Sequence, residues 1–71
     1  MTTATIIDVL ESWPLELRLR TQDNQTLHVS LSEDCRITQD GRALAPGSLE
    51  PGQVVVVQRE PNGAIRSIEI R

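Results

Sequence analysis

Three side chains in the middle of the chain are of the types that form a nucleophile, a base and an orienting acid. They are Cys35, His28 and Asp34. Such a triad works when the base contacts the nucleophile and the acid holds the base in place. The alternation of neighbouring residues predicts that His28 faces solvent and that Cys35 faces inward, so the two side chains diverge. We therefore expect no catalytic residues and no enzymatic activity.

The same residue types are too few to bind a metal ion. A zinc site needs three or four ligands, and one histidine with one cysteine does not supply them. Carboxylates occur at Glu33-Asp34 and singly in turns, without the spacing of a calcium-binding loop. The four glycines are all separate turn residues and form no phosphate-binding loop. We predict neither a metal site nor a cofactor.

Two features remain as candidates for an interaction surface. Trp13-Pro14 joins the only aromatic residue to a proline, and rigid aromatic side chains are enriched at binding hot spots. Alternatively, Trp13 packs as a lid over one end of the fold. All seven basic residues are arginine, and a guanidinium contacts carboxylates and phosphates through two parallel hydrogen bonds. We select Trp13, Pro14, Arg18, Arg20 and Arg59 as the candidate surface.

The arginines also have a structural interpretation, because on neighbouring strands they could pair with Glu16 and Glu69. Nucleic-acid binding is disfavoured. Proteins that bind single strands combine a basic groove with several aromatic platforms, whereas this chain has a net charge of −3 and 1% aromatic residues.

Length and composition predict one domain spanning residues 1–71. The hydrophobic fraction of 38% and the charged fraction of 24% are those of a globular protein, and a chain this short has a thin core. No apolar run approaches the roughly 20 residues that cross a bilayer. The start of the chain lacks the pattern of a signal peptide, and a single cysteine excludes an internal disulfide, so we expect a cytoplasmic location.

Hydrophobic alternation predicts an all-β fold. Residues 15–20 and 26–31 place leucine or valine at every second position, and the polar cluster 22–25 joins them into an antiparallel hairpin. The alternation skips one residue near Ile7-Asp8 and again near Arg66-Ser67, which indicates β-bulges in the first and last strands.

The remaining segments predict three further features. Cys35 and Ile37 face inward on a short fourth strand, which ends at an Asp40-Gly41 turn. At most one helical turn lies near residues 47–50, with Leu49 anchored in the core. Residues 54–57 form a strand that returns through the turn 60–63. The expected core residues include Leu17, Leu19, Leu27, Val29, Ile37, Val54 and Val56.

These elements predict a small closed or half-open antiparallel β-barrel of five to six strands, with OB-like (oligonucleotide/oligosaccharide-binding) or SH3-like topology. Closure removes the unpaired edges that a flat sheet would expose. The alternative is an open sheet that dimerises.

A series of core and turn motifs extends over nearly the whole chain. It comprises Ala4-x-Ile6-x-x-Val9, Leu15-x-Leu17-x-Leu19, Leu27-x-Val29-x-Leu31, Cys35-Arg36-Ile37-Thr38, Asp40-Gly41, Leu49-Glu50-Pro51-Gly52-Gln53-Val54-Val55-Val56, and Gly63 before Ile68-x-Ile70. This series resembles small bacterial OB-like β-barrel domains of unknown function. Residues 51–63 also resemble the closing hairpin of SH3-like FeoA-type iron-transport accessory domains. The resemblances imply a fold, and no catalytic or ligand residue follows from them.

The sequence therefore predicts a non-enzymatic interaction module that binds a protein partner or self-associates through a strand edge or the Trp13 end. The first alternative is an OB-like or SH3-like domain that binds nucleic acid through Arg18, Arg20 and Arg59, with Trp13 as the single stacking platform. The second is a barrel that binds a small molecule or an ion.

Overall fold

The computed structural model describes residues 2–12 and 14–71. Its elements are β1 (Thr2–Leu10), β2 (Glu16–Thr21), β3 (Thr26–Gln39), β4 (Arg42–Leu44), the 3-10 turn η1 (Pro46–Ser48), β5 (Val54–Arg59) and β6 (Ile65–Ile70). The described part of the chain holds no helix long and apolar enough to cross a membrane. The prediction of an all-β fold with one helical turn is confirmed. Trp13, for which we predicted a lid or a hot spot, lies outside the described residues.

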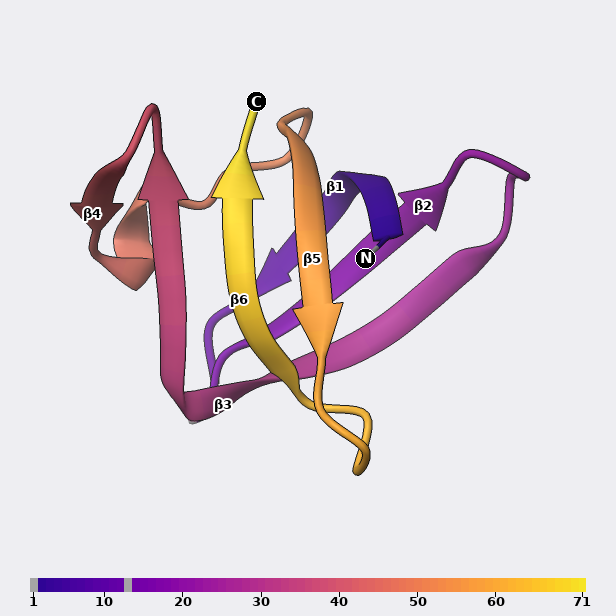
Figure 1. Cartoon of the computed structure of the whole chain (residues 1–71). Helices are drawn as coiled ribbons and strands as arrows, with labels where there is room; N and C mark the ends of the chain where they lie inside the picture. Colours follow the sequence, from indigo (N-terminus) through magenta and orange to yellow (C-terminus); the bar gives the residue numbers. More distant parts are fainter. Residues whose placement is uncertain (1, 13) are drawn as a thin grey trace.

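Five strands close into a barrel, and β4 is added outside it. The order around the barrel is β1-β2-β3-β6-β5, and β5 pairs back with β1. All of these pairs are antiparallel except β3 with β6. In Figure 1, β5, β6 and the second half of β3 stand side by side, and β3 bends sharply where it leaves this group. The closed barrel replaces the alternative of an open sheet.

The strand order forms a Greek key. The strands β1, β2 and β3 follow one another through short connections, and the next barrel strand, β5, returns to lie beside β1. This arrangement of three consecutive strands and a returning fourth defines the motif. OB folds are five-stranded Greek-key barrels, and the observed barrel is consistent with the predicted OB-like or SH3-like topology.

The predicted hairpin and both predicted bulges are confirmed. Leu17 lies opposite Val29, and Leu19 lies opposite Leu27. The register of β1 against β2 shifts between Ile6 and Asp8. The register of β5 against β6 shifts where Gln58 faces Ser67 and Arg59 faces Ile65, which leaves Arg66 as the extra residue.

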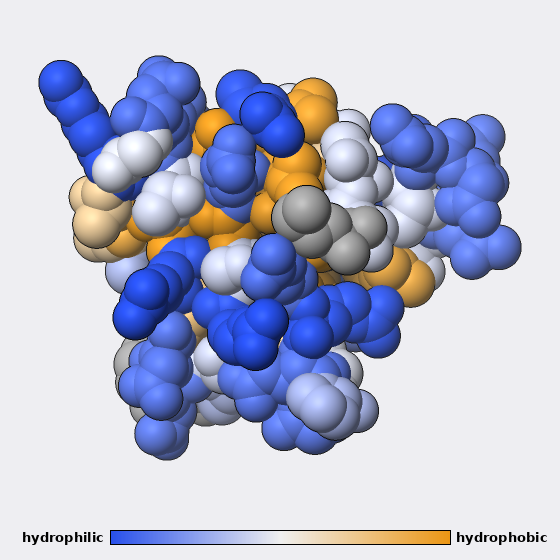
Figure 2. Space-filling view, in the orientation of Figure 1, coloured by the Kyte–Doolittle hydropathy of each residue, from blue (hydrophilic) through white to orange (hydrophobic). Residues whose placement is uncertain are grey.

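The core fills the barrel with aliphatic side chains from every strand except β4. In Figure 2, hydrophilic side chains cover most of the visible face, and hydrophobic surface shows between them. Its buried members are Ala4, Ile6, Leu17, Leu19, Val29, Leu31, Ile37, Leu49, Val55, Val57, Ile65, Ile68 and Ile70. Leu49 follows η1 and is 5% exposed, so its side chain is anchored in the core as predicted. Leu27 is only partly buried and packs against this core.

The prediction that Val54 and Val56 of β5 face the core was wrong. Val54 is 42% exposed and Val56 half-buried, whereas Val55 and Val57 are almost completely buried. Four consecutive valines carry no alternation, so their phase depends on the partner strand. Val57 lies opposite Ile68, which faces the core, and both side chains therefore point inward.

The predicted separate fourth strand was also wrong. Cys35 and Ile37 belong to β3, which continues for 14 residues. The strand changes partners without a turn: its first half pairs with β2, and its second half pairs with β6 and β4. The Asp40-Gly41 turn that follows is confirmed, since both residues have positive φ angles of 53° and 79°.

The corrected phase of β5 can be tested with two isosteric substitutions. We expect Val55→Thr to lower the free energy of unfolding by about 1–3 kcal/mol, because it places a hydroxyl without a partner in the apolar core. The matched change Val54→Thr should alter it by less than about 0.5 kcal/mol, because Val54 faces solvent. Chemical denaturation of both variants measures the difference. A larger loss for Val54→Thr would contradict the observed phase.

Candidate functional site

The barrel is left unpaired along one edge of β3. Residues 26–30 pair with β2 on one side. On the other side, pairing with β6 begins only at Leu31, opposite Ile65, and resumes at Arg36. Within the described part of the chain, residues 26–30 therefore have no strand partner on the side away from β2. We call this stretch the free edge of β3.

The hydrogen-bond register identifies the backbone groups on the free edge. The Leu31 amide donates to the Leu15 carbonyl at 2.9 Å. Antiparallel strands exchange these bonds at every second residue, so the backbone groups of Thr26, His28 and Ser30 face away from β2. Because the Leu31 N–H already bonds to Leu15, the pairing of Leu31 with Ile65 uses the Ser30 carbonyl. Among the described residues, the N–H and C=O groups of Thr26 and His28 and the N–H of Ser30 have no strand partner.

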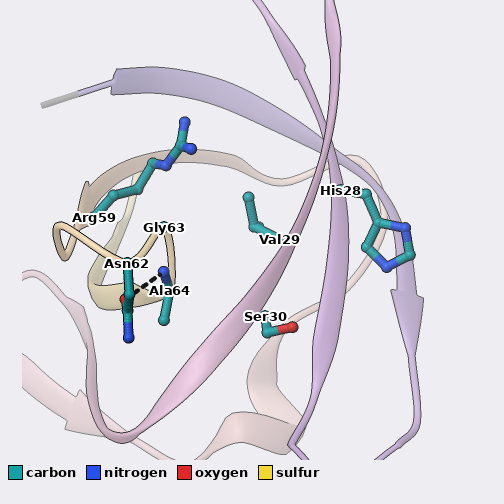
Figure 3. Close-up of a pocket in the computed structure, with 7 residues that line it drawn as sticks. All are labelled: His28, Val29, Ser30, Arg59, Asn62, Gly63 and Ala64. Atoms are coloured by element: carbon teal, nitrogen blue, oxygen red, sulfur yellow. Dashed lines mark hydrogen bonds between the residues drawn. The ribbon is translucent and has the colours of Figure 1, made fainter.

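A hollow of about 310 Å³ lies beside the free edge. Its lining residues are His28, Val29, Ser30, Arg59, Asn62, Gly63 and Ala64. Figure 3 shows the β3 residues facing Arg59 and the β5–β6 turn across an open space. The Val29 side chain is only 6% exposed and belongs to the core, whereas the His28 ring is turned away from the turn (Figure 3). The hollow thus exposes backbone groups of β3 on one wall and a turn on the other.

The turn that forms the second wall is held by its own hydrogen bonds. The Glu60 N–H donates to the Ala64 carbonyl, and the Gly63 N–H donates to the Glu60 carbonyl, both at 2.8 Å. The Asn62 side-chain oxygen accepts from the Ala64 N–H at 3.0 Å (Figure 3). Gly63 has a φ of 90°, which L-residues with a side chain rarely adopt. These hydrogen bonds fix the conformation of the turn without any contribution from a ligand.

The charges around the hollow leave one guanidinium available. His28 pairs with Glu16 on β2, and Arg18 lies 3.7 Å from Asp8. Arg59 is exposed at the end of β5, and no ion pair to it occurs among residues 2–12 and 14–71. The hollow therefore combines the unpaired backbone groups of the free edge with a guanidinium that has no ion pair within the described residues.

The residues selected from the sequence border different parts of the surface. Arg59 lines the hollow at the free edge. Arg18 lies on the outer face of β2, opposite His28. Arg20 borders a separate hollow of about 230 Å³ beside Val54. The described residues of the set, with Pro14 included, do not form one surface.

Pro14 and Cys35 line a small apolar slot of about 70 Å³. Burial raises the pKa of the Cys35 thiol from its ordinary 9.0 to about 11, so the thiol is protonated at neutral pH. His28 lines the hollow at the free edge and Cys35 does not, as their opposite directions predict. In the described chain, no three His, Cys, Asp or Glu side chains cluster as metal ligands.

The sequence interpretation missed the backbone of His28 and Ser30 and the wall at Asn62. One signal was present in the sequence. Residues 26–39 contain no proline or glycine. No strand-ending residue therefore stops β3 at the point where its pairing with β2 ends. A strand longer than its partner must change partners, and its edge can be left free where it does so.

Comparisons with known proteins do not add to the geometry. No protein-family model, curated protein or solved structure matches the chain.

The raised pKa of Cys35 predicts how stability depends on pH in alkaline solution. The folded-state pKa lies above the unfolded one, so the contribution to stability is complete below about pH 9 and is lost as pH rises towards about 11. The chain has no lysine and no tyrosine, so no other side chain titrates in this window.

We expect thermal unfolding measured from pH 8 to 11 to show a fall in stability for the native chain and none for Cys35→Ser. Labelling of the folded thiol by a disulfide reagent at pH 8 should be slower than in urea by about tenfold or more, since the thiolate is the reactive form. Equal labelling rates, or an unchanged pH dependence in Cys35→Ser, would contradict this assignment.

Proposed function

We propose that this chain is a non-enzymatic binding module that takes up an extended segment of a protein partner as an added strand on the free edge of β3. The observation that supports it most directly is the set of unpartnered backbone groups of His28 and Ser30 beside an open hollow. An edge of this kind is a template for another chain. Peptide binding by strand addition uses main-chain hydrogen bonds for affinity and side-chain hollows for specificity.

The number of available bonds sets the strength of the complex. The five backbone groups on the free edge, each worth about 0.5–1.5 kcal/mol net in a hydrogen bond, do not produce tight binding by themselves. Additional affinity comes from partner side chains that enter the hollow and contact Arg59 and the turn at Asn62. We expect dissociation constants between about 1 μM and 1 mM, as in transient signalling contacts.

Charge favours a partner with an acidic residue at one position. Arg59 borders the hollow and can donate two parallel hydrogen bonds to a carboxylate. The partner segment that fits is therefore extended, rich in β-branched residues, and acidic where it passes Arg59. A second copy of this chain is a less suitable occupant, because the exposed residues of its own β3 edge include His28 and no carboxylate.

Nucleic-acid binding remains the alternative, because the face formed by the second and third strands of OB folds binds oligonucleotides. The support for it is weaker here. Arg18 is paired with Asp8, and Arg20 lies beside a different hollow from Arg59. For the location of the protein we propose the cytoplasm, since one cysteine gives no disulfide framework.

The test is selection of binders from a random peptide display library, followed by calorimetry with the selected peptides. We expect peptides with alternating β-branched residues and one acid. His28→Pro should weaken their binding at least about tenfold, because proline removes the N–H from the free edge. His28→Ala loses the same ring and keeps the N–H, so its affinity should stay within about threefold.

The ligand provides a second control that leaves the protein unchanged. Methylation of the peptide nitrogen opposite His28 should abolish binding, whereas methylation of the next nitrogen, which points away, should not. Equal binding by His28→Pro and His28→Ala, or by both methylated peptides, would contradict strand addition. Salt-dependent binding of single-stranded oligonucleotides without any selected peptide would favour the alternative.

A further inference from the structure

The outer face of the barrel carries another hollow, lined by polar side chains and away from the free edge. It has a volume of about 440 Å³, and its lining residues are Asp34, Arg36, Gln58, Arg66 and Ser67. These residues come from the second half of β3, from β5 and from β6, which stand side by side in Figure 1. The core-facing neighbours Ile37, Val57 and Ile68 are buried, so this hollow lies on the outward face of the sheet.

The sheet register places three of these side chains in one row. Ser67 is paired with Arg36 on one side and with Gln58 on the other. Adjacent strands are about 4.7–4.9 Å apart, so the row spans about 10 Å and its long side chains can reach a common centre. The hollow is therefore built from neighbouring residues of three strands.

The bulge in β6 adds the second guanidinium. Without the extra residue, Arg66 and Ser67 would point to opposite faces of the sheet. Because Arg66 is left over in the pairing of β6 with β5, both side chains lie on the outward face and line the same hollow. The Arg66 Nη2 donates to the Gln58 Oε1 at 3.2 Å, which holds this guanidinium over the row.

The groups that remain in the hollow are mainly hydrogen-bond donors. The Gln58 oxygen is occupied by Arg66, so its NH₂ is left to donate, and an arginine has five N–H donors and no acceptor. The Ser67 hydroxyl can also donate. Over the described ranges of the chain, neither Arg36 nor Arg66 forms an ion pair with a carboxylate. A group with several acceptor oxygens would satisfy these donors.

We propose that this hollow binds the phosphoryl group of a small molecule, held by Arg36, Arg66, Ser67 and the Gln58 amide. Four donor side chains match the three or four oxygens of a phosphoryl group better than the two of a carboxylate, and each guanidinium can bind two of them. Asp34, which also lines the hollow, and the net charge of −3 oppose a long polyanion, so the ligand is compact. The site is independent of the peptide-binding function proposed above.

The test is an NMR titration of the protein with inorganic phosphate and with pyrophosphate at constant ionic strength. We expect saturable shifts of the backbone amides of Arg36, Arg66 and Ser67. Arg36→Gln and Arg66→Gln should each weaken binding by about tenfold or more, since each removes charged donors. Asp34→Asn should strengthen it by about two- to threefold, because it removes a nearby negative charge.

Arg20→Gln is the matched control, because it removes the same charge at a different hollow. It should leave the affinity within about twofold, and thermal unfolding of every variant checks that the fold is intact. Shifts that do not saturate, or an equal loss in Arg20→Gln and Arg66→Gln, would indicate general charge attraction and overturn the site. Saturable binding of succinate but not of phosphate would overturn the assignment to a phosphoryl group.

Discussion

The structure depends on one strand, β3, that pairs with two other strands along its length. In this chain of 71 residues, the five-stranded barrel closes because its longest strand, β3, pairs with β2 first and with β6 afterwards. The change of partners between Leu31 and Arg36 closes the core around Leu31 and Ile37. It also leaves residues 26–30 with one partner where a barrel strand usually has two. Closure and the free edge therefore have the same physical origin.

Local patterns predicted the parts of this fold that depend on neighbouring residues. Strict alternation predicted the hairpin of β2 with β3, and the skipped alternation predicted the bulges near Ile7 and Arg66. The inward phase of Val55 and Val57 was not predictable in this way, since a run of valines has no period. The continuity of β3 and the late start of β6 are tertiary features. The free edge depends on both, and its one sign in the sequence is that residues 26–39 contain no proline or glycine.

The two proposed binding regions lie on the same sheet but present different groups to a ligand. The free edge presents backbone groups, because β6 begins too late to cover His28. The outer hollow presents side chains, because the bulge turns Arg66 and Ser67 to one face. Arg59 faces the first region, and Arg66 faces the second. The two arginines of this acidic chain are thus divided between the two proposed binding regions.

Amide hydrogen exchange of the free protein, measured residue by residue by NMR, tests the central claim most directly. Pairing with β2 should protect the amides of Leu27, Val29 and Leu31. The amides of His28 and Ser30 should exchange much faster, because they face the open edge and donate to no other strand. Protection of His28 and Ser30 equal to that of Leu27 and Val29 would show that the edge is covered, and would contradict this account.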